Sequence, residues 1–102
     1  MKNVQIHRTN EFATWLINLR DRQARAKIMA RIDRLEEENP GKTRSLGAGV
    51  VEMKIDFGPG YRVYFVQRGK VLVLLLCCGD KSTQDKDIQR AKALAGQLTE
   101  AE

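Results

Sequence analysis

Residues 50–84, VVEMKIDFGPGYRVYFVQRGKVLVLLLCCGDKSTQ, decide the fold of this 102-residue chain. The stretch contains three strand-like runs that are separated by two short turns with glycine. Side chains in the first run alternate between apolar and polar, which predicts a strand with one face in a core. The third run, residues 71–78, is apolar at every position, as expected for a central strand covered on both faces. The stretch therefore predicts an antiparallel-rich sheet.

The first two runs are joined by Gly58-Pro59-Gly60, a composition typical of a tight turn. If the strands pair symmetrically about Pro59, Asp56 lies opposite Arg62 and Lys54 lies opposite Tyr64. One face of the hairpin then carries these four side chains together. A slip of one residue would scramble this arrangement, and a bulge at the glycines stays open.

The segment before residue 50 predicts one short strand and two helices. Residues 2–7 alternate weakly and could form a first strand. Thr9 or Asn10 can cap one helix and Asp21 can start another, each followed by apolar residues at helical spacing. Residues 41–49 are polar and contain three glycines, which predicts a loop before the sheet resumes.

After the third strand, Ser82 or Thr83 can cap a final helix, with Asp85 as a shortened capping-box partner. The expected order is therefore β-α-α-β-β-β-α. This order is an α+β fold, in which an antiparallel-rich sheet packs against two N-terminal helices and carries a C-terminal helix. Residues 1–102 fit one domain, and an apolar share of 42% is enough for one modest core.

Charge is distributed unevenly along the chain. The formal net charge is +5, and residues 41–81 hold seven Lys or Arg against three Asp or Glu. A basic surplus of this kind favours an anionic partner such as nucleic acid. The surplus coincides with the strand block, so we expect the basic surface to lie on the sheet.

Cys77 and Cys78 are the only cysteines. Neighbouring strand residues point to opposite faces, which argues against a disulfide between them. No second ligand cluster accompanies them, so we expect neither a metal nor another cofactor. The N-terminus lacks the apolar stretch of a signal peptide, and the longest apolar run is far below the roughly 20 residues of a membrane helix. We therefore expect a cytoplasmic protein that does not bind membranes.

Two motifs carry a resemblance to a known family: GPGYRVYF at residues 58–65 and GDKSTQ at residues 79–84. With the order of elements, they resemble the RelE/ParE toxin superfamily, in its branch of addiction-module killer proteins related to HigB-like toxins. The resemblance spans essentially the whole chain and implies a RelE-like fold. It implies a toxin of a type II toxin–antitoxin system, neutralised by a cognate antitoxin that is a small DNA-binding protein.

The resemblance implies more than one activity. Most RelE-type members are metal-independent endoribonucleases that cut mRNA on the ribosome and so inhibit translation. ParE-type members share the fold and inhibit DNA gyrase without being enzymes. A third alternative is an inactive member that only binds its antitoxin. The apolar Val66 on the open face of the sheet and the weak N-terminal strand are candidate surfaces for that partner.

RNA cleavage of this kind needs a base for the 2′-hydroxyl, an acid for the leaving 5′-oxygen, and cations for the phosphate. The resemblance assigns these tasks to Lys, Arg and Tyr side chains. Arg62 becomes a phosphate clamp, while Lys54 and Lys81 stabilise charge or transfer protons. Tyr64 stacks on a base or orients the phosphate. Alternatively, Arg62 only pairs with Asp56 and Tyr64 is a packing residue.

Further candidates surround these residues. Arg44, Thr83 and Gln84 are candidate RNA contacts, although helix capping is the competing role for Thr83. Asp56 and Glu52 share the expected cationic face, where they would repel a phosphate. They either hold the cations in place or face the antitoxin.

Overall fold

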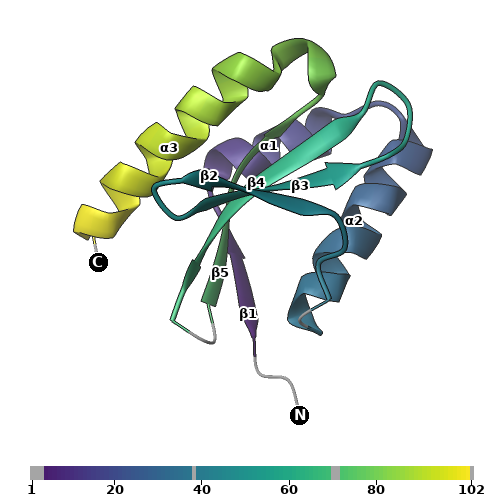
Figure 1. Ribbon diagram of the computed structural model, residues 1–102. Helices are drawn as coiled ribbons and strands as arrows, with labels where there is room; N and C mark the ends of the chain where they lie inside the picture. Colours follow the sequence, from purple (N-terminus) through teal and green to yellow (C-terminus); the bar gives the residue numbers. More distant parts are fainter. Residues whose placement is uncertain (1–3, 38, 70–71, 102) are drawn as a thin grey trace.

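The computed structural model describes residues 4–37, 39–69 and 72–101, which form a five-stranded sheet with helices on both faces (Figure 1). The expected α+β fold is confirmed, with one strand more than expected. The expected turn at residues 68–70 lies partly outside the described residues. In chain order the elements are β1 Gln5–Arg8, α1 Asn10–Asn18, α2 Arg22–Glu36, β2 Thr43–Gly47, β3 Val50–Ile55, β4 Tyr61–Arg68, β5 Leu72–Gly79, the 3₁₀ turn η1 Lys81–Thr83, and α3 Gln84–Ala101.

The additional strand is β2, so the expected loop over residues 41–49 was wrong. The sheet order is β1-β5-β4-β3-β2, in which β1 runs parallel to β5 and all other neighbours are antiparallel. As an edge strand, β2 exposes nearly all its side chains and shows no apolar alternation to reveal it. A register shift near Gly47 and left-handed backbone at Ala48 (φ 57°) complete the turn into β3.

The β3–β4 hairpin pairs in a different register from the one expected. Lys54 lies opposite Arg62, and Glu52 lies opposite Tyr64. The symmetry about Pro59 was wrong because the turn is centred one residue earlier, at Gly58, which adopts φ 56°. Glycine tolerates this left-handed conformation without the steric cost that a side chain would add.

Two hydrophobic clusters cover the two faces of the sheet. Helices α1 and α2 pack on one face, over Met53, Val63 and Leu75, which are all fully buried. Helix α3 packs on the other face (Figure 1). Residues of β5 pack into both clusters, so its uninterrupted apolar sequence is explained. Because α3 covers the face that was expected to be open, Val66 is only 3% exposed and the partner surface assigned to it was wrong.

Side-chain caps begin the first two helices at the expected residues. The Thr9 hydroxyl accepts the backbone N–H of Phe12 at 3.0 Å and donates to the carbonyl of Leu76 at 2.7 Å. Asp21 accepts the backbone N–H of Ala24 at 3.1 Å. Thr9 therefore also ties the start of α1 to β5.

The final helix begins differently from the expectation. The turn η1 precedes α3, and the residue that caps η1 is Asp80, not Ser82 or Thr83. The Asp80 carboxylate accepts both the backbone N–H of Ser82 at 2.8 Å and its hydroxyl at 2.6 Å. A carboxylate at this position satisfies N–H groups that would lack a partner at the start of the turn.

Arg31 joins α2 to the sheet. Its guanidinium donates to the backbone carbonyls of Lys54 at 2.7 Å and Pro40 at 2.8 Å. Burial lowers the pKa of Arg31 from its ordinary value.

We expect Arg31→Ala to lower the free energy of unfolding by about 1–3 kcal/mol, because two carbonyls lose a charged donor. Arg34→Ala, an exposed neighbour on the same helix, is the control and should change it by less than about 0.5 kcal/mol. Equal urea midpoints for the two variants would contradict this role.

Both cysteine thiols are buried between the sheet and the helices. Burial raises the pKa of Cys77 to about 12 and raises that of Cys78 well above its ordinary value. Since the thiolate is the reactive form, we expect iodoacetamide at pH 8 to label the native protein about a thousand-fold more slowly than the urea-unfolded chain. Mass spectrometry of timed samples measures both rates. Comparable rates would show that the thiols are accessible in the native state.

Within the described ranges, no helix combines the length and the apolar composition that crossing a membrane requires.

Candidate nucleic-acid interface

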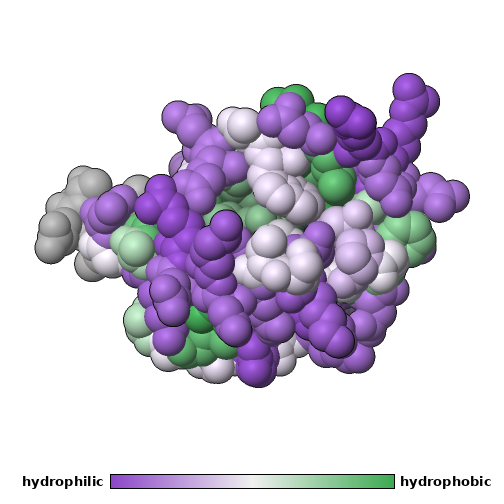
Figure 2. Space-filling model, turned by 90° about the horizontal axis from the view of Figure 1, so that it is seen from above, coloured by the Kyte–Doolittle hydropathy of each residue, from purple (hydrophilic) through white to green (hydrophobic). Residues whose placement is uncertain are grey.

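Two adjoining hollows lie where β3 and β4 meet the start of α3. They measure about 400 Å³ and 410 Å³, and Lys54 and Arg62 line both of them. The end of the molecule seen from above is mostly hydrophilic, with hydrophobic residues showing only in separate patches (Figure 2). We call these two adjoining hollows together the cationic hollow. Its charged and amide side chains are Lys42, Arg44, Glu52, Lys54, Asp56, Arg62, Lys81 and Gln84.

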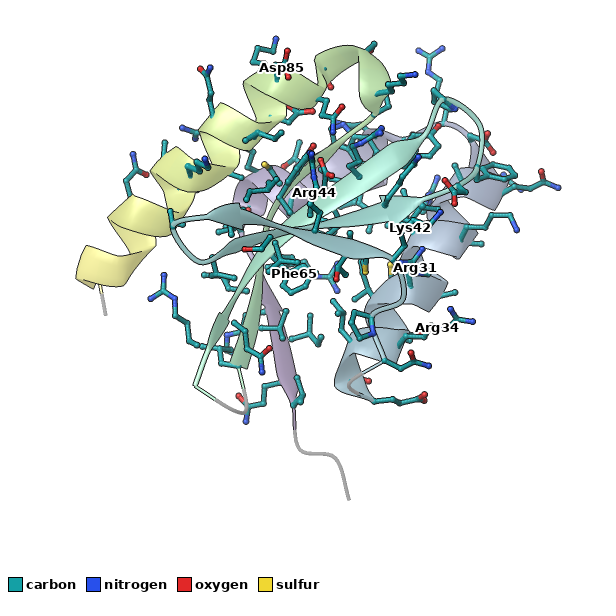
Figure 3. The ribbon with its side chains drawn as sticks, in the orientation of Figure 1. Arg31, Arg34, Lys42, Arg44, Phe65 and Asp85 are labelled. Carbon is teal, nitrogen blue, oxygen red and sulfur yellow. The ribbon has the colours of Figure 1, made fainter. Side chains whose placement is uncertain are left out.

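The cations of this hollow come from four separate segments of the chain. Lys54 and Arg62 are cross-strand neighbours on β3 and β4, and Arg44 lies opposite Glu52 on β2. Lys81 arrives from η1: a methyl group placed on Gly60 would lie 3.8 Å from the Cβ of Lys81 and 3.3 Å from Nη1 of Arg62. Arg44 and Lys42 lie along the β2 side of the sheet (Figure 3). The fold thus brings together four of the sequence-predicted cations.

Arg62 is almost completely buried, at 7% exposure, on the floor of the hollow. Its Nη1 donates to the carbonyl of Gly60 at 2.7 Å, and its Nε lies 3.7 Å from Oε2 of Glu52. The pairing of Arg62 with Asp56 is therefore not the one that forms. Asp56 instead contacts Lys42 at 3.0 Å and Lys54 at 3.5 Å.

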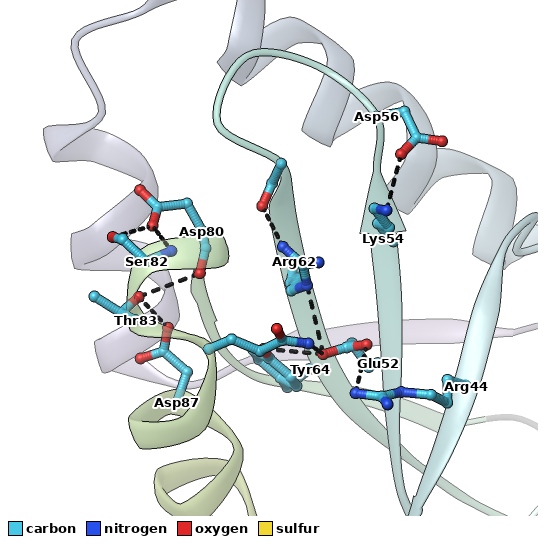
Figure 4. Close-up of polar contacts among 12 residues, drawn as sticks. Arg44, Glu52, Lys54, Asp56, Arg62, Tyr64, Asp80, Ser82, Thr83 and Asp87 are labelled. Carbon is cyan, nitrogen blue, oxygen red and sulfur yellow. Dashed lines mark hydrogen bonds and ion pairs between the residues drawn. The ribbon is translucent and has the colours of Figure 1, made fainter.

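Glu52 is the centre of the polar contacts beneath the hollow (Figure 4). Its Oε2 accepts from the Tyr64 hydroxyl at 3.2 Å and from the Gln84 amide at 2.9 Å, and its Oε1 lies 3.2 Å from Nη2 of Arg44. It is 5% exposed. Sequence reasoning gave Glu52 two possible roles, holding the cations in place or facing the antitoxin, but not its partners, because these depend on the true hairpin register and on a contact with α3 32 residues away.

Tyr64 lies below this network, and its ring is fully buried against α3. Burial first, and then the charge of Glu52, raise the pKa of Tyr64 far above its ordinary value. Stacking on a nucleobase requires an exposed ring. The position therefore favours the packing alternative for Tyr64.

Thr83 and Gln84 follow each other in the chain and share one hollow at the start of α3, but only Gln84 also lines the cationic hollow. The Thr83 hydroxyl instead donates to Asp87 at 2.6 Å and lines a separate hollow of about 900 Å³, together with Trp15 and Tyr61. Burial raises the pKa of Asp87, and the Thr83 hydrogen bond opposes that shift. The larger hollow gathers no comparable group of cations, so we place the candidate anion site in the cationic hollow.

The charges around the cationic hollow favour an anion. Five Lys or Arg side chains face two carboxylates, which leaves three uncompensated positive charges. Hydrogen bonding to Lys42 holds the pKa of Asp56 below its ordinary value, so this carboxylate is ionised at neutral pH and offsets part of the positive charge. Arg62 combines a planar guanidinium with burial, a setting that suits a phosphate group. A phosphodiester is therefore the ligand class that the arrangement fits best.

One comparison with known proteins identifies a family. The family model described as phage derived protein Gp49-like (DUF891) matches residues 15–99. The chain is also similar to an uncharacterized protein of Haemophilus influenzae, with 53% identity over 95 residues that cover 93% of this chain and 96% of the relative. No solved structure matches.

Proposed function

Because the chain belongs to the phage-derived Gp49-like family, a toxin-like family of the RelE type, we propose that it is the toxin of a toxin–antitoxin pair. We further propose that it belongs near the HigB-like branch and inhibits translation by cutting mRNA on the ribosome. The observation that carries this proposal is the convergence of Arg44, Lys54, Arg62 and Lys81 around one hollow. This activity would place the protein in the cytoplasm.

In the proposed reaction, the RNA backbone lies in the cationic hollow with one phosphate against Arg62. The 2′-oxygen attacks this phosphorus as its proton leaves, and the bond to the 5′-oxygen breaks as that oxygen takes a proton. Lys54 and Lys81, on opposite sides of Arg62, are the candidates for the two proton transfers. Charge that develops on the phosphate is stabilised by Arg62, which is held before the reaction begins, and by the more exposed Arg44. Gln84 is positioned to contact the adjoining nucleotide.

The proposed partners follow from this activity: mRNA, the ribosome and a cognate antitoxin. An acidic antitoxin segment would complement the cationic hollow and exclude RNA from it. A second docking place is the free edge of β1, which pairs only with β5 among the described strands. Co-expression with the product of the adjacent small reading frame should abolish toxicity. If toxicity persists and no complex forms in a pull-down, that product is not the antitoxin.

Two parallel assays separate this function from gyrase inhibition. We expect the purified protein to stop cell-free translation and to leave DNA supercoiling by gyrase unchanged at the same concentration. The opposite pair of results would establish the ParE-like alternative. No effect in either assay, together with normal growth on induction, would leave antitoxin binding as the function.

A further inference from the structure

We propose that Glu52 is a positioning residue that locks the Arg62 guanidinium for phosphate binding; this inference rests on the proposed function. The Glu52 side chain is 6% exposed and that of Arg62 is 8% exposed, so the pair lies beneath the surface of the cationic hollow. A buried carboxylate below a site for anions has a cost in affinity through charge repulsion. Its presence is explained if it orients the cation that binds the anion.

The contacts of Arg62 show how the lock works. Gly60 accepts a hydrogen bond from Nη1 at 2.7 Å. Nε is buried without a hydrogen-bond partner among the described residues and faces the Glu52 carboxylate at an ion-pair distance of 3.7 Å, so the charge of Glu52 is what holds this side of the guanidinium. Among the described residues, none accepts a hydrogen bond from Nη2. An arginine side chain has many rotamers, and this freedom is lost before the substrate binds if the group is already fixed. Nη2 is then the donor left for the phosphate.

The contacts of Glu52 show why it positions and does not take a proton. The Tyr64 hydroxyl and the Gln84 amide both donate to Oε2, while Arg44 occupies Oε1. Although Glu52 lines the cationic hollow, both of its oxygens already have partners there. The Arg44 side chain is 58% exposed, so it can turn toward a phosphate while the buried contacts stay in place.

Glu52→Gln tests the lock because it removes the charge and keeps the shape. We expect kcat for mRNA cleavage to fall about 10- to 100-fold, with a smaller change in KM, as for other groups that orient a functional side chain. The matched control is Glu11→Gln, which breaks the ion pair that joins Glu11 of α1 to Arg90 of α3, two residues that do not line the cationic hollow. It should leave kcat unchanged. Equal effects of the two variants, at equal loss of melting temperature, would overturn the proposal.

A chemical-rescue experiment separates positioning from stability. Millimolar guanidinium should restore part of the activity of Arg62→Ala, because Glu52 and the Gly60 carbonyl still form the cradle. The same ion should not rescue the folded double variant Glu52→Gln/Arg62→Ala. Equal rescue of both variants would show that Glu52 does not hold the guanidinium.

A second readout does not need nuclease activity. The Arg62 Nε–H signal in ¹⁵N NMR should exchange with water at least ten-fold faster in Glu52→Gln than in wild type. If the wild-type protein fails to cut mRNA but its Nε–H exchange is still slower than that of Glu52→Gln, the proposed function is wrong and the positioning role stands. Unchanged exchange, in the presence of cleavage, would remove the positioning role alone.

Discussion

Replacing Arg62 with alanine is expected to lower the rate of mRNA cleavage by roughly 10²- to 10³-fold, the usual effect of removing one pre-oriented donor from a charged transition state. The guanidinium is held by Gly60 and faces Glu52 before substrate arrives, so its loss cannot be replaced by a mobile surface cation. Arg62→Lys keeps the charge and loses the planar fork, and we expect it to recover only a part of the activity.

The control for this prediction is Arg34→Ala, which removes an exposed arginine from α2 and should cut as well as wild type. Arg62→Ala also removes one partner of the buried Glu52, which we expect to lower the free energy of unfolding by about 1–3 kcal/mol. Rates are therefore compared at a temperature at which circular dichroism shows both variants to be folded. Cleavage by folded Arg62→Ala at the wild-type rate would show that the cationic hollow is not the active site.

The second large effect is on stability. Tyr64→Ala is expected to lower the free energy of unfolding by about 3–5 kcal/mol, because it opens a cavity between β4 and α3. Tyr64→Phe keeps the ring, loses only the hydrogen bond to Glu52, and should cost about 1–3 kcal/mol. Urea unfolding measures both values. The folded fraction of Tyr64→Phe should retain most of the cleavage rate, because the phenol does not line the cationic hollow.

The pH dependence of stability gives Tyr64 a separate signature. Its pKa is raised in the folded protein, so the folded state favours the protonated phenol. This contribution is complete below the ordinary pKa of 10.0 and is lost as the pH rises through the folded value. Wild type should therefore lose stability above about pH 10 more steeply than Tyr64→Phe. Parallel curves, or a cleavage rate for Tyr64→Phe reduced as much as for Arg62→Ala, would instead support a direct role in the reaction.

Sequence patterns predicted those elements that bury apolar side chains. Helices α1 and α2 follow an apolar period of 3.6 and β3 follows a period of 2, while the uninterrupted apolar run of β5 indicated a strand covered on both faces. The caps Thr9 and Asp21 begin the helices as expected. Strand β2 has no buried face to impose a period, so its sequence resembles a loop. The hairpin register depends on the residue at which the turn is centred, and local composition does not decide this because the glycines on both sides of Pro59 adopt a positive φ.

The candidate site was likewise predicted only in part from the sequence. Arg44, Lys54, Arg62, Lys81 and Gln84 do lie around one hollow, because the strand alternation and the chain order place them on neighbouring segments. The burial of Tyr64 was not predictable, since α3 covers a face that the hairpin alone leaves open. The partners of Glu52 were not predictable either, because they come from β2, β4 and α3.

The central claim is that the cationic hollow cuts mRNA on the ribosome. The most direct test incubates purified protein with ribosomes programmed with a defined mRNA and maps the 5′ ends that form. We predict new ends within the coding region that require both the ribosome and Arg62. No new ends with wild-type protein, or the same ends with folded Arg62→Ala, would contradict the claim.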